Sequence, residues 1–304
     1  MTISCTCPQC GRVCGFKDQY AGRRARCLAC NARFIIPAAD GAKAVPVQPS
    51  PQEPLPGFFR AALADNFSVF IQKESLFGII LSAALIAFHF FAGNADYSFT
   101  VGHFRPPLIV GWIVTFGCAG YLLWYCMEII NSTFMDNDFL PDIFVGTGFA
   151  FLGESVKNIY LFIAAAAAAA IPGSAVTALL EIIGLTHQGL QTAIVLLSLT
   201  MWPMMLAMLG SGAAPWELFR YDRIIRMIAK TAGAYLLTAS VTFAALLAVY
   251  VTVGLFAQDI KSSAGILAAL AARLAAAGAL LFAMRTIGLY ARHYFRCFPE
   301  LFPS

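Results

Sequence analysis

Four cysteines near the start of the 304-residue chain have the spacing of a metal site. Cys7 and Cys10 form one CxxC pair, Cys27 and Cys30 form a second, and sixteen residues separate the pairs. Tetrahedral Zn²⁺ is bound by four thiolates, and paired CxxC segments are the form in which zinc ribbons supply them. The sequence therefore predicts a structural zinc ion held by these four cysteines.

The residues around the two pairs favour zinc over other uses of cysteine. Gly11 and Asn31 follow the pairs and tolerate a left-handed backbone, and neither is the histidine that c-type haem attachment needs. Cys5 and Cys14 form no CxxC pair and are expected to be spare thiols. A disulfide framework is the alternative, but residues 1–10 contain no apolar signal segment, so we expect a reducing compartment.

The same segment resembles a known family. It contains the runs CPQCG, YAGRRARC and FIIP within residues 7–37. Over this length it resembles the zinc-ribbon finger at the N-termini of many uncharacterised multi-pass bacterial membrane proteins. The resemblance implies metal binding by the same four cysteines, with Leu28 at a position where proline is common. The pattern of the region that follows resembles that of Yip-type membrane proteins of unknown function.

The composition predicts an integral membrane protein. The chain is 60% hydrophobic, only 12% charged and has a mean hydropathy of +0.74, whereas about a quarter of a soluble domain is charged. Six apolar stretches approach or exceed the roughly 20 residues that a transmembrane helix needs. They are Leu76–Gly93, Leu108–Ile130, Ile159–Leu180, Thr192–Ser211, Thr231–Phe256 and Ile266–Leu289.

These stretches divide the chain into four parts. We expect a zinc-ribbon domain at 1–37, a Pro/Ala-rich linker at 38–57, a helical transmembrane domain at 58–290 and a cytoplasmic tail at 291–304. The fold class is therefore mainly α, with a six-helix transmembrane bundle that follows a small β-type zinc ribbon.

Basic residues predict the orientation. The first 75 residues contain nine Lys or Arg and the loop 211–230 contains four, whereas the loop 94–107 contains one and 181–191 contains none. Positive charge accumulates on the cytoplasmic side. With six spans, both termini are expected in the cytoplasm of a bacterial cell, with the chain in the inner membrane.

A weak threefold pattern precedes the spans. Each copy has a proline, a stretch that mixes aromatic and charged residues, and a lysine: Pro56 to Lys73, Pro141 to Lys157, and Pro215 to Lys230. If the pattern is a repeat, the fold consists of three helical hairpins, each preceded by an interfacial helix on the cytoplasmic leaflet, and coincidence is the alternative. The third stretch can reach lipid phosphates with its four basic residues, and an ordinary positive-inside loop is the plainer reading.

Two alanine-rich segments, Ala164–Ala170 and Ala268–Ala279, allow close helix packing and are expected at the centre of the bundle. Arg273 lies within the second of them, where an arginine costs about 2.5–3.5 kcal/mol on insertion scales. Snorkelling to the outer interface would relieve that cost. Glu181 is the nearest acid at a similar depth and could be its partner.

Three functions remain open, and none is enzymatic, because the chain has no paired carboxylates and no nucleophile–base set. We expect a membrane subunit or adaptor whose cytoplasmic zinc ribbon docks a protein partner while the helices contact membrane lipids. A transporter or channel component with Arg273 in its pathway is the alternative. A membrane-tethered nucleic-acid binder is a third, but nucleic acid is not expected as a partner, because residues 1–36 offer few aromatic stacking platforms beside their six basic side chains.

Overall fold

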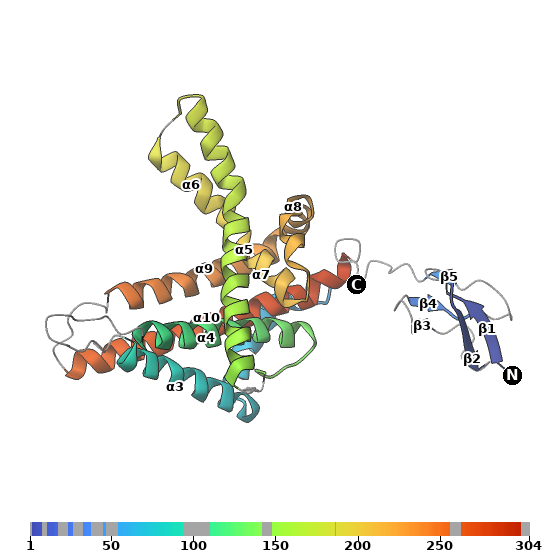
Figure 1. The fold of residues 1–304 in the computed structure, drawn as a ribbon, viewed down its shortest axis with the longest axis horizontal. Helices are drawn as coiled ribbons and strands as arrows, with labels where there is room; N and C mark the ends of the chain where they lie inside the picture. The colour runs from blue at the N-terminus through green and yellow to red at the C-terminus, as the bar shows by residue number, and fades with distance from the viewer. Residues whose placement is uncertain are drawn as a thin grey trace. The chain divides into compact units, whose positions relative to one another are not determined.

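A computed structural model of the chain describes residues 2–7, 11–17, 24–26, 33–37, 45–46, 54–93, 110–141, 148–185, 187–255 and 263–298. The chain divides into two compact units, Met1–Gln52 and Glu53–Ser304. The first consists of short strands and the second is helical (Figure 1).

The N-terminal unit contains two small antiparallel sheets. In the first, β1 (Thr2–Thr6) pairs with β2 (Val13–Lys17). The second has the strand order β3 (Arg24–Arg26), β4 (Arg33–Ile35) and β5 (Val45–Pro46). The strand β5 lies within the segment predicted as linker, since Val45 pairs with Ile35 and extends this sheet beyond residue 37.

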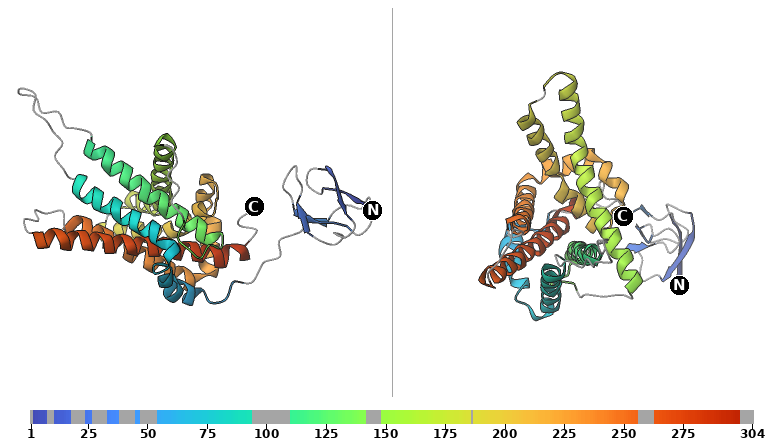
Figure 2. Two further views of the ribbon diagram at one scale, coloured as in Figure 1. Left: turned by 90° about the horizontal axis from the view of Figure 1, so that it is seen from below. Right: turned by 60° about the vertical axis from the view of Figure 1, so that its left-hand side comes forward.

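Among the described residues, the second unit has six helical segments that are long and apolar enough to cross a membrane, which confirms the predicted number. Four of the helices lie side by side along a common direction (Figures 1 and 2). They are α3 (Leu76–Ala92), α4 (Val110–Phe134), α9 (Ala232–Leu255) and α10 (Ser263–Tyr294). The helices α3 and α4 run in opposite directions, and so do α9 and α10. The connections within these two pairs therefore lie at the same end of the four helices (Figure 1).

The remaining hairpin differs from the prediction. The helices α5 (Gly148–Ile182) and α6 (Gln188–Leu199) pack against each other, and α5 runs across the direction of the other four helices (Figure 1). The fourth predicted span is broken, because the chain turns at Thr200–Met201 and restarts as α7 (Trp202–Gly210). Pro203 suits the first turn of the new helix, where its missing N–H is not needed.

The core of the helical unit lies around α7. Every residue from Pro203 to Gly210 is buried, and α7 contacts α4, α5, α9 and α10. Small residues permit these approaches: a Cβ at Gly210 would lie 2.3 Å from the Ile130 side chain. Ala165, Ala168 and Ala169 belong to this core, but most of Ala268–Ala279 is partly exposed. The expectation that both alanine-rich segments form the centre is therefore correct only for the first.

Two of the three predicted interfacial segments form separate short helices. The first contains α1 (Phe58–Arg60), the π-helical turn Ala61–Asp65 and α2 (Asn66–Val69). The third contains the 3₁₀ turn Pro215–Phe219 and α8 (Tyr221–Lys230). In the second, the residues from Gly148 onward are continuous with α5, because no proline interrupts that helix before Pro172.

The third interfacial segment packs against the helical core, whereas the sequence suggested that it could contact lipid. Ile224 and Met227 are buried in the core, and the Tyr221 hydroxyl donates to the Ala168 carbonyl at 2.8 Å. Its arginines are paired within the segment: Arg220 and Arg223 with Glu217 at 3.5 and 3.1 Å, and Arg226 with Asp222 at 2.7 Å. These contacts favour the reading as a positive-inside loop.

Candidate functional site

Cys7, the first residue of the first CxxC pair, follows β1 directly. The Cys7 amide donates to the Arg12 carbonyl at 2.9 Å, and the Gly11 amide donates to the Cys7 carbonyl at 3.1 Å. Gly11 has φ +70°, the left-handed conformation expected after the second cysteine of a pair. The Cys7 side chain is 2% exposed. Cys7 and Gly11 therefore lie in the connection between the two strands of the β1–β2 hairpin.

The second pair has the same place in the topology. Arg26 pairs with Arg33 in the β3–β4 hairpin, so Cys27 and Cys30 fall in the connection between two antiparallel strands. Cys10, Cys27 and Cys30 lie outside the described residues. Within the described part of the chain, no group of three metal-binding side chains is present. Cys5 and Cys14 are cross-strand neighbours in β1 and β2.

Arg273 contacts an aromatic ring and not the acid suggested by the sequence. Its guanidinium carbon lies 4.8 Å from the centroid of the Phe90 ring on α3. Glu181 accepts a hydrogen bond from Gln191 at 3.0 Å and is exposed. Phe90 covers one face of the guanidinium by a cation–π contact, which offsets part of the cost of placing Arg273 in this helix, and no carboxylate among the described residues pairs with it.

A charged cluster that sequence reasoning missed lies at the C-terminal end of α10. Arg292 contacts Asp136 at 2.6 Å and Asp138 at 3.2 Å, and Arg296 contacts Asp136 at 2.9 Å. Asp136 follows α4 with φ 70°, in the left-handed position that often ends a helix. The hydrogen bond from Arg296, assisted by the charge of Arg292, holds the pKa of the Asp136 carboxyl below its usual range.

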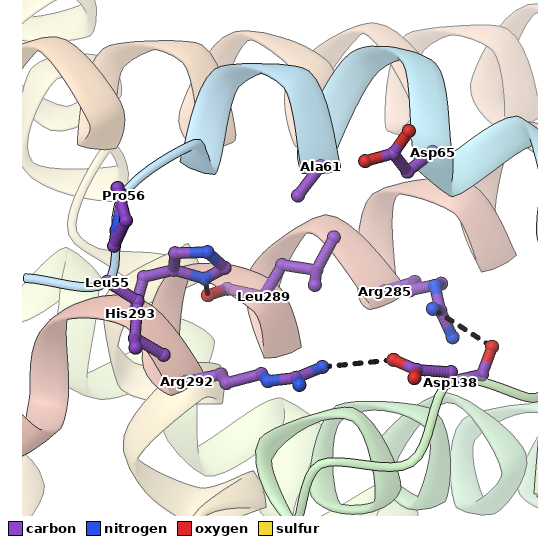
Figure 3. A pocket seen from close by; sticks show the side chains of 9 residues that line it. All are labelled: Leu55, Pro56, Ala61, Asp65, Asp138, Arg285, Leu289, Arg292 and His293. Carbon is purple, nitrogen blue, oxygen red and sulfur yellow. Dashed lines mark hydrogen bonds and ion pairs between the residues drawn. The ribbon is translucent and has the colours of Figure 1, made fainter.

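Next to this cluster is a cavity of about 420 Å³ (Figure 3). It lies between α10 and the segment that precedes α3, and Asp138 forms one wall. Arg285, Leu289 and His293 are buried, whereas Leu55, Pro56, Asp65 and Asp138 are exposed, so the cavity opens to the surface. The residues that line it are Leu55, Pro56, Ala61, Asp65, Asp138, Arg285, Leu289, Arg292 and His293.

Arg285 is the unusual member of this cavity. It is only 4% exposed, and its Nη2 donates to the Asp138 carbonyl at 3.2 Å. Its Nε and Nη1 are buried and have no hydrogen-bond partner in the described part of the chain. The arrangement can therefore bind an anion in a partly apolar cavity.

A signal for this cluster was present in the sequence. Arg285, Arg292 and Arg296 have the spacing i, i+7, i+11, which places them on one face of a helix. Asp136 and Asp138 follow the second apolar stretch closely. What the sequence does not provide is the burial of Arg285, because burial depends on how α1 and α2 pack over α10.

Comparisons of the chain with known protein families, with curated proteins and with solved structures found no match.

Proposed function

We propose that the protein is a non-enzymatic membrane subunit or adaptor of the bacterial inner membrane, whose cytoplasmic zinc ribbon docks a protein partner. The observation that carries the proposal is the packed centre of the helical unit. The helix α7 fills it with side chains that are fully buried, among them Met204, Met205 and Leu206. Such a centre, filled by apolar side chains, suits a body that anchors and packs.

The N-terminal unit supplies the docking function in this proposal. It is a separate compact unit, and each of its CxxC pairs falls at the end of an antiparallel hairpin. Two such hairpins facing one ion are the arrangement of a zinc ribbon, and Cys7, Cys10, Cys27 and Cys30 would be the ligands. A structural zinc site would keep this small unit folded while the helices stay in the membrane.

The test is co-purification from bacterial membranes with the full-length chain. The variant carrying Cys27→Ser and Cys30→Ser should lose a stoichiometric partner that the wild type retains, and Cys14→Ser should retain it. Both variants should remain in the membrane fraction. A partner retained equally by all three chains, or stoichiometric with none, would contradict docking through the ribbon.

The proposed topology has its own test. An impermeant maleimide applied to intact cells should label a cysteine placed at Thr186 or Ser262, and should not label one at Asp138 or Ser211. Thr186 is the informative site, because it connects α5 to α6 and α5 runs across the direction of the other four helices (Figure 1). Protection of Thr186 together with labelling of Ser262 would reduce the number of spans to four.

A further inference from the structure

Arg285 has donors that the described protein groups do not use. Its guanidinium carries five N–H groups and keeps its positive charge. One nitrogen donates to the Asp138 carbonyl at 3.2 Å, whereas the buried Nε and Nη1 have no partner among the described residues. Buried charges are normally paired, because removal from water is costly. The charge of Asp138 acts on this guanidinium, but among the described residues no carboxylate forms an ion pair with it within 4.0 Å.

The nearby carboxylates are occupied by other arginines. The Asp138 carboxylate contacts Arg292 at 3.2 Å, and the Asp65 carboxylate contacts Arg60 at 3.7 Å. Asp136 is shared between Arg292 and Arg296. Around the cavity, these three aspartates and the four arginines Arg60, Arg285, Arg292 and Arg296 leave a surplus of one positive charge. Of these four, Arg285 has no ion pair with a described residue.

The cavity has the size and shape for a ligand at this position. Its volume of about 420 Å³ lies within the range of about 300–1,000 Å³ typical of small-molecule sites. Figure 3 shows Arg285 and Leu289 facing it from α10, with Ala61 and Asp65 on the opposite side. The side chains of Leu55, Ala61 and Leu289 give it an apolar part next to the guanidinium.

The depth of Arg285 along α10 narrows the class of ligand. The candidate membrane span in α10 is Ala264–Cys297, and Arg285 lies 21 residues after its first residue. At 1.5 Å per helical residue this distance is about 32 Å, close to the thickness of about 30 Å of a hydrocarbon core. The whole candidate span of 34 residues is longer than a hydrocarbon core requires, so Arg285, which lies 12 residues before its end, can reach the level of the lipid phosphates on the side opposite to the start of α10.

We propose that this cavity binds a phosphoryl group, with Arg285 as the residue that pairs with its oxygens. A guanidinium matches two oxygens of a phosphate with parallel hydrogen bonds from two neighbouring nitrogens. In Arg285, Nη1 and the second N–H of Nη2 can supply such a pair, and Nε can donate a separate hydrogen bond. The phosphoryl group can come from an anionic lipid headgroup or from soluble phosphate, since both present the same oxygens. This site does not depend on the docking function of the N-terminal unit.

The test measures binding to the purified full-length chain in a neutral detergent. The probes are a short-chain phosphatidic acid, inorganic phosphate and the corresponding diacylglycerol, which lacks the phosphate. Each is titrated while the thermal unfolding midpoint is followed, because a ligand that binds the folded state raises it. Phosphatidic acid or inorganic phosphate should raise the midpoint of the wild type, and diacylglycerol should not.

Four variants identify the site. Arg285→Gln should weaken binding of the phosphate-bearing probe at least tenfold, and Arg285→Lys should weaken it less. Ala61→Phe should also weaken it, because it fills the cavity without altering Arg285. The matched control is Arg273→Gln, an arginine on the same helix outside the cavity, which should bind as the wild type does. If Arg285→Gln does not fold, Ala61→Phe and Arg285→Lys decide.

The probes separate the two sources. A response to phosphatidic acid alone assigns the site to a lipid headgroup, and an equal response to inorganic phosphate assigns it to the soluble ion. The proposal is overturned if neither probe raises the midpoint, or if Ala61→Phe and the Arg285 variants bind as tightly as the Arg273→Gln control.

Discussion

In the N-terminal unit the strands contain two to five residues, whereas helices of the second unit reach 35 residues. The buried apolar residues described in the first unit are Cys5, Cys7 and Ile36, and the second buries a continuous cluster around α7. A unit of about fifty residues with short strands gains little from apolar burial, so a metal cross-link is the usual remedy. We therefore expect the first unit to unfold when its metal is removed, and the second to unfold when its helix packing is disturbed.

The largest expected effect is loss of the metal. The variant with Cys27→Ser and Cys30→Ser should unfold the N-terminal unit, because the binding free energy of a structural zinc, about 10–16 kcal/mol in zinc-finger peptides, is also folding free energy. The helical unit should remain inserted, since its core contains none of these residues. Zinc content and protease sensitivity of the segment before residue 53 are the measurements.

The control for this prediction is Cys14→Ser, which changes a cysteine of β2 outside the two pairs. It should retain zinc at one ion per chain. If the zinc content of the double variant equals that of the wild type, or if the wild type contains no zinc, the first unit is not stabilised by a metal bound to these cysteines.

The second effect perturbs the helical unit alone and uses two glycines of α10. A Cβ at Gly288 would lie 2.7 Å from the Thr133 Cβ and 2.9 Å from the Ile130 carbonyl oxygen, whereas a Cβ at Gly278 meets nothing within 4 Å. Gly288→Ala should therefore destabilise the helical unit by about 1–3 kcal/mol, the usual cost of overpacking. Gly278→Ala should be neutral or stabilise it by up to about 1 kcal/mol, because alanine favours the helix.

The two glycine variants are compared by thermal unfolding in detergent, with zinc content as the readout for the other unit. Both should bind zinc as the wild type does. Equal unfolding midpoints for the two variants would show that the close approach of α10 to α4 at Gly288 is not present in the protein.

A smaller effect is the difference in how the stability of the two units depends on pH. The lowered pKa of Asp136 means that its contribution to stability is complete above the ordinary aspartate pKa of about 3.9 and is lost as the pH falls through the lower folded value. Because the carboxylate is 47% exposed, this contribution should be below about 1 kcal/mol. Zinc thiolates take up protons at higher pH, so the N-terminal unit should release its metal first.

The matched variant is Asp136→Asn, which keeps a residue that tolerates the left-handed backbone and removes the charge. Its unfolding midpoint should lie slightly below that of the wild type at pH 7 and pH 5, and the difference should shrink towards pH 3. A difference that grows on acidification would reverse the sign of the assigned interaction.

The number of spans was predictable from the sequence because helical apolar segments are long and continuous, as in Leu76–Ala92. The break at Thr200–Met201 was predictable in principle from Pro203, but the buried position of α7 was not, since it depends on contacts with four other helices. The direction of the α5–α6 hairpin was not predictable either, because a hydropathy pattern gives the length of an apolar segment and not the angle at which its helix crosses the others. The spacing of the four cysteines can be read directly from the sequence. The N–H groups of Arg285 that have no partner among the described residues could not be predicted, because their burial depends on the packing of α1 and α2 over α10.

The smallest expected effect concerns Arg273. Replacement by leucine removes the cation–π contact with Phe90, which is worth about 0.5–1 kcal/mol at an exposed site, and also removes a charge from an apolar helix. These changes oppose each other, so Arg273→Leu should alter the stability of the helical unit by less than about 1 kcal/mol. It should leave zinc content and partner co-purification unchanged, because the residue belongs to neither the ribbon nor the packed centre around α7.

The decisive measurement is solute or ion flux into liposomes that contain the purified chain, with the variant in parallel. Flux by the wild type that Arg273→Leu eliminates would identify a transport pathway along α10 and α3, and would replace the adaptor proposal with the transporter alternative.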